Sequence, residues 1–169
     1  MEQSSQIPSA DKNFEYATQK VIKITYKNAN IANPEYYFKS SAQATVDSGV
    51  VTAVCGNGVT PMNCTPLSLT TLAENTWYKT EDLTPEVIYA ANGTLYALTS
   101  DGTNASGTAT YVISNIDISE PKTNVKITDI KTDRVALSAT CSDTQSGIIK
   151  YEFSKDGGKN WVDNGTKNE

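Results

Sequence analysis

The residues with the clearest chemical potential are the three cysteines, Cys55, Cys64 and Cys141. The segment between Cys55 and Cys64 contains two glycines, two asparagines and a proline, which favour a turn that brings its ends together. We therefore predict a disulfide between Cys55 and Cys64, with two free thiols or a zinc site as alternatives; a zinc site lacks a His or second Cys pair to complete it. A disulfide indicates an oxidising compartment. Cys141 lies in an apolar alternation and is expected to be a buried core residue.

Groups for catalysis are scarce. The chain contains no histidine, so neither a Ser-His-Asp nor a Cys-His site can be assembled from it. No glycine-rich phosphate loop followed by Lys-Ser or Lys-Thr is present. The adjacent carboxylates Glu81 and Asp82 lie in a loop-like stretch, where solvation explains them. We expect a protein that is not an enzyme and that needs no cofactor.

Four aromatic residues, Trp77, Tyr78, Tyr89 and Tyr96, fall in segments with strand character. On an exposed face they would form a platform on which a sugar ring stacks. Aromatic residues in strands more commonly pack in the core or against cross-strand neighbours. Both interpretations stay open from the sequence.

Four acidic residues in turns could bind calcium. Asp101, Asp117, Glu120 and Asp143 lie in turn-like segments, and oxygen ligands from loops suit this ion. Aspartate is also a common turn former in its own right, and this is the simpler explanation. We predict no metal site and retain these four residues as the weak alternative.

Charge and hydropathy argue against binding to nucleic acid or membranes. The net charge is −5 and no run of Lys or Arg occurs, so nucleic acid and anionic membranes are disfavoured partners. The longest apolar runs are too short to cross a bilayer, and we expect no membrane insertion in this segment. Met1 opens into a polar stretch without a signal peptide. For a protein outside the cell, this implies a removed leader or an internal segment.

The elements that must position these side chains are strands. Short apolar alternations or β-rich runs are separated by turn signals, and no sustained helical period occurs. This pattern predicts an all-β, antiparallel sandwich. The expected strands cover residues 21–26, 36–38, 42–46, 50–54, 76–79, 86–90, 94–99, 108–114, 125–130, 134–139 and 148–153. Asn92-Gly93 between two of them is the strongest short hairpin signal.

The strand series divides the chain. Residues 1–15 are polar and unpatterned and are expected to be a flexible tail, and residues 16–118 form the first β-sandwich. Pro121 follows an extended junction, because proline cannot donate to a strand ladder. Residues 119–169 show fewer strands than a complete module of about seven strands requires. We expect this second module to be partial, either truncated or completed by something outside the chain.

Three stretches resemble bacterial immunoglobulin-like repeats. Residues 92–104 (NGTLYALTSDGTN) are similar to the late strands of such repeats, and residues 111–117 (YVISNID) before Pro121 to the junction between them. Residues 141–148 (CSDTQSGI) are similar to the start of a following repeat. The resemblance covers roughly residues 36–163. It implies an Ig-like or fibronectin-III-like fold in a Gram-positive cell-surface or pilin-like protein.

A more specific motif lies near the end of the sequence. Ser154, Asp156, Gly158 and Trp161 match the Asp-box pattern Ser-x-Asp-x-Gly-x-x-Trp, which is familiar from sialidase propellers. Propellers repeat the box in each blade, whereas it occurs once here. We therefore expect a structural hairpin in which Asp156 accepts backbone hydrogen bonds and the glycines adopt positive φ.

Together these features predict a non-catalytic extracellular structural or adhesion module of a bacterial surface protein, acting as a stalk or as a spacer for a binding domain. Its partners would be a host protein, a glycan or neighbouring modules. The alternative is a carbohydrate-binding accessory module of a secreted glycoside hydrolase. A sialidase-type fragment is the third hypothesis, and it depends on the single Asp box.

Overall fold

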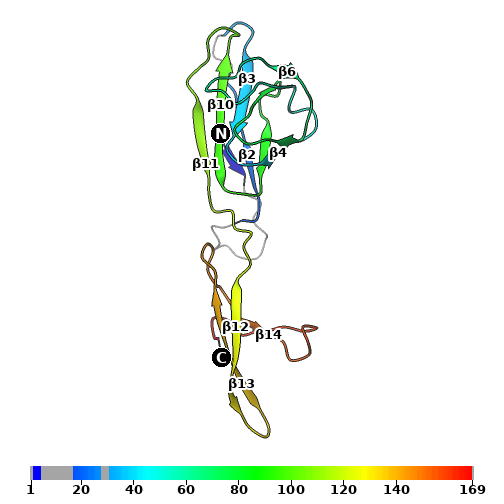
Figure 1. Cartoon of the computed structure of the whole chain (residues 1–169), viewed down its shortest axis with the longest axis vertical. Helices are drawn as coiled ribbons and strands as arrows, with labels where there is room; N and C mark the ends of the chain where they lie inside the picture. The colour runs from blue at the N-terminus through cyan, green and yellow to red at the C-terminus, as the bar shows by residue number, and fades with distance from the viewer. Residues whose placement is uncertain (1, 5–16, 28–30, 169) are drawn as a thin grey trace. The chain divides into compact units, whose positions relative to one another are not determined.

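The computed structural model describes residues 2–4, 17–27 and 31–168 (Figure 1). Within these ranges the chain is all-β, as predicted, and every pair of neighbouring strands is antiparallel. None of the described residues belongs to a helix, and so none forms a long apolar helix of membrane-spanning length. The chain divides into two compact units, Met1–Ile118 (unit 1) and Ser119–Glu169 (unit 2).

Unit 1 contains two sheets. The first sheet has the order β1-β2-β9-β4-β7 and the second sheet the order β11-β10-β3-β8-β5-β6. The strands of the first sheet are β1 (Glu2–Ser4), β2 (Lys20–Lys23), β4 (Ala44–Thr45), β7 (Thr71–Leu72) and β9 (Glu86–Tyr89). Those of the second sheet are β3 (Glu35–Ser40), β5 (Ala53–Val54), β6 (Thr65–Pro66), β8 (Trp77–Thr80), β10 (Gly93–Ser100) and β11 (Ala109–Ile113).

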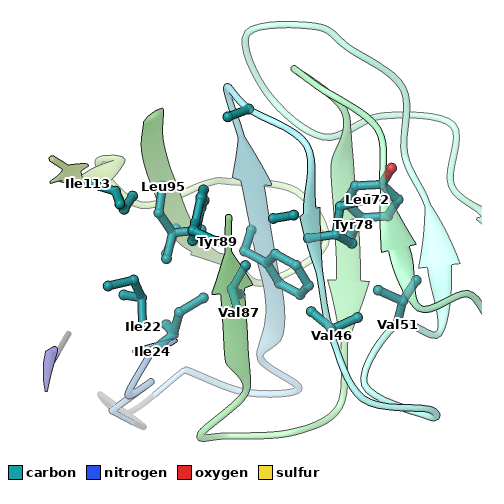
Figure 2. Packing of buried hydrophobic residues seen from close by; sticks show 14 of the residues in the cluster. Ile22, Ile24, Val46, Val51, Leu72, Tyr78, Val87, Tyr89, Leu95 and Ile113 are labelled. Atoms are coloured by element: carbon teal, nitrogen blue, oxygen red, sulfur yellow. The ribbon is translucent and has the colours of Figure 1, made fainter. Parts of the chain in front are cut away.

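The two sheets share one hydrophobic core, which makes unit 1 a β-sandwich (Figure 2). Ile22 and Val87 of the first sheet face Phe38 and Leu95 of the second, and all four side chains are fully buried. Burying such a side chain contributes about 1.5–3 kcal/mol. The two-residue alternation of the strands therefore specifies which face of each sheet turns inward.

The first residues of the chain take part in the first sheet. Glu2–Ser4 form β1, whose residues pair with Val21–Lys23 of β2. The remainder of the flexible tail expected over residues 1–15 lies outside the described residues.

The hairpin predicted at Asn92-Gly93 is wrong. The strands on either side, β9 and β10, lie in different sheets, so this dipeptide belongs to a crossover. Gly93 has a structural reason: a Cβ at this position would lie 2.7 Å from the Cβ of Ala42. The two backbones are this close because Ser41 and Thr94 are hydrogen-bonded, Ser41 N to Thr94 O at 2.9 Å and Thr94 N to Ser41 Oγ at 2.8 Å. Close approach of two backbones, rather than a two-residue turn, explains the glycine.

Unit 2 consists of two small sheets in its described residues. β12 (Lys122–Ile130) pairs with β13 (Val135–Ser142), and β14 (Glu152–Phe153) pairs with β15 (Val162–Asp163). Of the strand predicted over residues 148–153, only β14 forms. Val125, Ile127 and Leu137 remain exposed, so this unit leaves much of its apolar surface in contact with solvent.

Two tyrosines of the core provide a matched test of polar burial. The Tyr89 hydroxyl is buried and finds no hydrogen-bond partner in the described part of the chain. The Tyr78 hydroxyl, in contrast, accepts a bond of 2.7 Å from Ala73 N. An unpaired buried polar group costs free energy that a paired one does not.

We expect Tyr89→Phe to leave the free energy of unfolding unchanged or to raise it by up to about 1 kcal/mol. Tyr78→Phe should lower it by about 1–2 kcal/mol, since it leaves the amide of Ala73 without its partner. Urea denaturation of both variants measures this difference. Equal losses in the two variants would show that the Tyr89 hydroxyl has a partner after all.

Candidate functional site

The Cys55–Cys64 disulfide forms as predicted. Cys55 directly follows β5 and Cys64 directly precedes β6, and these two strands pair. The two Cα atoms are therefore only 3.9 Å apart. Gly56 (φ 76°) and Asn63 (φ 55°) adopt left-handed conformations just inside the two cysteines. Glycine and asparagine tolerate this conformation, which allows the chain to turn at both ends of the loop.

The disulfide loop, residues 55–64, is held against the second sheet by Trp77 of β8. The Trp77 amide donates to Gly56 O at 2.7 Å, and its indole Nε1 donates to Gly58 O at 3.0 Å. In the opposite direction, Cys55 N donates to Trp77 O at 2.8 Å. Trp77 is consequently only 1% exposed. The loop acts as a cover over this ring.

A second, smaller hydrophobic cluster lies on the face of the second sheet that points away from the core. We call it the outer cluster: Tyr37, Cys55, Trp77 and Leu98 are buried in it, and Tyr96 packs against it. Strand alternation explains it, since the residues flanking Tyr37 and the residue following Trp77 point into the main core. The second sheet is thus packed on both faces.

Charged residues border the outer cluster. The Lys39 Nζ lies 4.7 Å from the centroid of the Trp77 ring and 5.1 Å from that of Tyr96, within range of a cation–π interaction. Glu35 accepts hydrogen bonds of 2.6 Å from both Lys79 Nζ and the Tyr37 hydroxyl. These bonds, that of Lys79 first, lower the pKa of Glu35. Burial, and then the bond to Glu35, raises the pKa of Tyr37.

Sequence reasoning did not identify these charged residues. Glu35, Tyr37 and Lys39 alternate along β3, while Trp77 and Lys79 alternate along β8. The register that pairs Lys39 with Trp77 and Tyr37 with Lys79 brings them together. The alternation was available in the sequence, but the register was not.

The four aromatic residues do not form a stacking platform. Tyr78 and Tyr89 belong to the main core, on the other side of the sheet from Trp77 and Tyr96. Trp77, Tyr78 and Tyr89 are each at most 1% exposed, so their ring faces are unavailable to a sugar. Only Tyr96 is partly exposed, and Lys39 lies over its ring.

Two of the four acidic residues considered for calcium, Asp101 and Asp143, accept hydrogen bonds within their own turns. Asp101 accepts hydrogen bonds from the amides of Thr103 (2.8 Å) and Asn104 (2.6 Å), and these bonds, that of Asn104 first, lower its pKa. Asp143 accepts bonds from the amides of the residues two and three positions further on, at 2.8 and 3.0 Å. The backbone amide of Asp117 donates to Ala17 O at 3.0 Å, and Glu120 is exposed. Among the described residues, no group of three or more acidic or cysteine side chains is placed to hold a metal ion.

The Asp-box residues form a closed turn between β14 and β15. Asp156 Oδ1 accepts bonds from the amides of Lys159 (3.1 Å) and Asn160 (2.9 Å), and Gly158 N donates to Ser154 Oγ at 2.8 Å. Gly158 has φ 85°, and the Trp161 indole donates to its carbonyl at 3.1 Å. The hydrogen bonds from Asn160, and then from Ser154, hold the pKa of Asp156 at about 2.

Cys141 is only partly buried, in contrast to the core position expected for it. Its Sγ lies 3.2 Å from Thr123 Oγ1 on the paired strand. Both residues line a cavity of about 680 Å³ within unit 2, along with Leu137, Phe153 and Trp161. The apolar alternation around Cys141 does lie on a strand, β13, but the face of β13 that carries Cys141 is only partly covered.

Removing the disulfide tests whether it holds the cover over Trp77. In a Trp161→Phe background, which silences the second tryptophan, we expect Cys55→Ser/Cys64→Ser to lower the free energy of unfolding by about 2–3 kcal/mol. Trp77 emission should shift to longer wavelength as its ring meets water. Cys141→Ser in the same background is the control and should change neither quantity. An unshifted Trp77 spectrum would show that the hydrogen bonds alone keep the cover in place.

Acidification tests the Asp-box turn. Because the folded-state pKa of Asp156 is about 2, below the ordinary 3.8, its carboxylate favours the turn above the ordinary pKa. This contribution is lost as the pH falls through the folded-state value. We expect the amide resonances of Lys159 and Asn160 to titrate near pH 2 in NMR spectra. Titration near pH 4 would contradict the hydrogen bonding described for this turn, and Asp156→Asn provides the non-titrating control.

Comparison with known proteins yields no relative for this chain. No protein-family model matches it, and neither does any curated protein or solved structure.

Proposed function

We propose that this chain is a non-catalytic, extracellular structural or adhesion module of a bacterial surface protein, which acts as a stalk or as a spacer for a binding domain. The main support for the proposal is the set of hydrogen bonds that hold the last segment of unit 1 against the sandwich. We call residues 114–117 the exit segment.

The exit segment pairs with Ala17, shortly before β2. Ala17 and Ile116 form a parallel bridge, in which Ala17 N donates to Asn115 O at 2.9 Å and Asp117 N donates to Ala17 O at 3.0 Å. Both Ala17 and Ile116 are buried. The exit segment is therefore bonded directly to the segment that leads into β2.

Two side chains from elsewhere in the first sheet and its connections reinforce this bridge. The side-chain amide of Asn92 bonds both backbone groups of Ile116: Ile116 N donates to Oδ1 at 2.9 Å, and Nδ2 donates to Ile116 O at 3.1 Å. The buried Lys20 donates from Nζ to Ser114 O. Asn92 thus takes the place of a neighbouring strand for the backbone of Ile116.

This geometry suits a module that carries tension along the chain. When tension acts between Ala17 and the exit segment, the two parallel segments slide along each other. The bonds between them are then loaded together, and not one after another. A stalk needs this resistance, because force enters each module at one terminus and leaves at the other.

The order of the strands supports the immunoglobulin-like part of the proposal. β1-β2-β9-β4 facing β11-β10-β3 has the same neighbour relations as strands A-B-E-D facing G-F-C in immunoglobulin domains. The disulfide supports an oxidising, extracellular compartment. The succession of two β units along the chain supports a role in an array of modules.

Single-molecule force spectroscopy tests the proposal. We expect Asn92→Ala to lower the force at which unit 1 unfolds, and to lower its free energy of unfolding by about 1–2 kcal/mol, because two hydrogen bonds to Ile116 are lost. Asn57→Ala, in the disulfide loop, is the matched control and should leave the force unchanged. A native unit 1 that extends without a distinct unfolding event, or an unfolding force that Asn92→Ala leaves unchanged, would contradict a role in carrying tension.

A further inference from the structure

Three Asn-Gly dipeptides occur in the sequence, at residues 57–58, 92–93 and 164–165. Asparagine before glycine is especially prone to deamidation, because glycine has no side chain that hinders its amide nitrogen from reaching the side chain before it. The three sites are alike in this respect. Their hydrogen bonds in the folded chain differ, and the difference singles out one of them.

Deamidation joins the asparagine side chain to the backbone of the glycine. The glycine nitrogen loses its proton to solvent and bonds to the asparagine Cγ, the bond from Cγ to Nδ2 breaks, and ammonia leaves. Water then opens the resulting succinimide ring at either of its carbonyl groups, which yields aspartate or isoaspartate. Hydrogen bonds that hold the asparagine amide or the glycine nitrogen oppose the first step, because they must break before the ring can close.

The side-chain amide of Asn92 is held at both of its polar atoms. Oδ1 accepts a hydrogen bond from Ile116 N at 2.9 Å, and Nδ2 donates to Ile116 O at 3.1 Å. Gly93 is the first residue of β10 and pairs with Ile113 of β11. Deamidation of Asn92 would therefore require the loss of both bonds to Ile116 and a displacement at the beginning of a strand.

The reacting groups of the third site are also engaged. Asn164 Nδ2 donates to Lys167 O at 2.7 Å. Gly165 N donates to Asp163 Oδ1 at 2.6 Å. The leaving nitrogen and the attacking nitrogen are thus both held in place by hydrogen bonds.

Asn57, in the disulfide loop, lacks these restraints. Within the part of the chain that the structure describes, neither its side-chain amide nor Gly58 N takes part in a hydrogen bond. Asn57 and Asn92 are both exposed, so exposure does not separate the two sites. Hydrogen bonding separates them.

We propose that Asn57 is a site of spontaneous deamidation, at which the folded chain acquires a carboxylate within the disulfide loop. Residues 48–73 otherwise contain no charged side chain. Isoaspartate also adds a methylene group to the backbone directly before Gly58, whose carbonyl accepts the hydrogen bond of the Trp77 indole. The modification therefore acts on the cover over Trp77, and it spares the bonds between Asn92 and Ile116.

Peptide mapping by mass spectrometry, after the native chain has been kept in mildly alkaline buffer, tests the proposal. Trypsin releases the three sites in separate peptides, because lysines lie between them. We expect Asn57 to become a mixture of aspartate and isoaspartate at least about tenfold faster than Asn92 or Asn164, which must first lose hydrogen bonds. In urea the three rates should become similar, since the dipeptides are alike once the fold is lost.

Two variants are matched controls for the gain of acidic species, which isoelectric focusing measures. Asn57→Gln keeps an amide, but its longer side chain closes the corresponding ring much more slowly, so the gain should slow to the rate of the other two sites. Asn164→Gln should leave the gain unchanged.

Three results would overturn the proposal. The first is a native chain in which Asn92 or Asn164 converts at least as fast as Asn57. The second is the same order of rates in urea, which would assign the difference to the local sequence and not to the fold. The third is a product at position 57 that contains aspartate but no isoaspartate, which would exclude attack by the Gly58 nitrogen.

Discussion

The packing of the second sheet on both faces is the constraint on which the rest of unit 1 depends. Its inner face meets the first sheet across the main core, and its outer face meets the disulfide loop across Trp77. A half-exposed sheet would present alternating polar residues on its outer side. Here the outer positions of β3, β8 and β10 hold Tyr37, Trp77 and Leu98, and these residues need a cover. The loop covers Trp77, and the disulfide closes the loop.

The features that the sequence predicted correctly are local ones. Alternation along the strands indicated the all-β antiparallel class, because the two-residue period depends only on neighbouring residues. The strand expected over residues 94–99 lies within β10, and that over 108–114 contains β11. The Cys55–Cys64 bond was also predictable, since the residues between the cysteines encode the turns that bring them together.

The features that could not be predicted depend on contacts between distant residues. Asn92-Gly93 has the composition of a tight turn, but the assignment of β9 and β10 to different sheets decides that it is a crossover. The residues around Trp77 indicate only that it lies in a strand. Its burial depends on the disulfide loop, which folds over it from elsewhere in the chain. The bonds of Asn92 to Ile116 join residues that are far apart in the sequence, and no short motif announces them.

The contact between Gly93 and Ala42 has a consequence for the variation that this sequence can accept. The two positions are far apart along the chain, yet the Cβ of Ala42 occupies the space that a side chain at position 93 would need. A side chain at position 93 would force the crossover away from Ala42. Reducing position 42 to glycine would make room for alanine at position 93. A side chain at position 93 therefore becomes acceptable only after residue 42 has been made smaller.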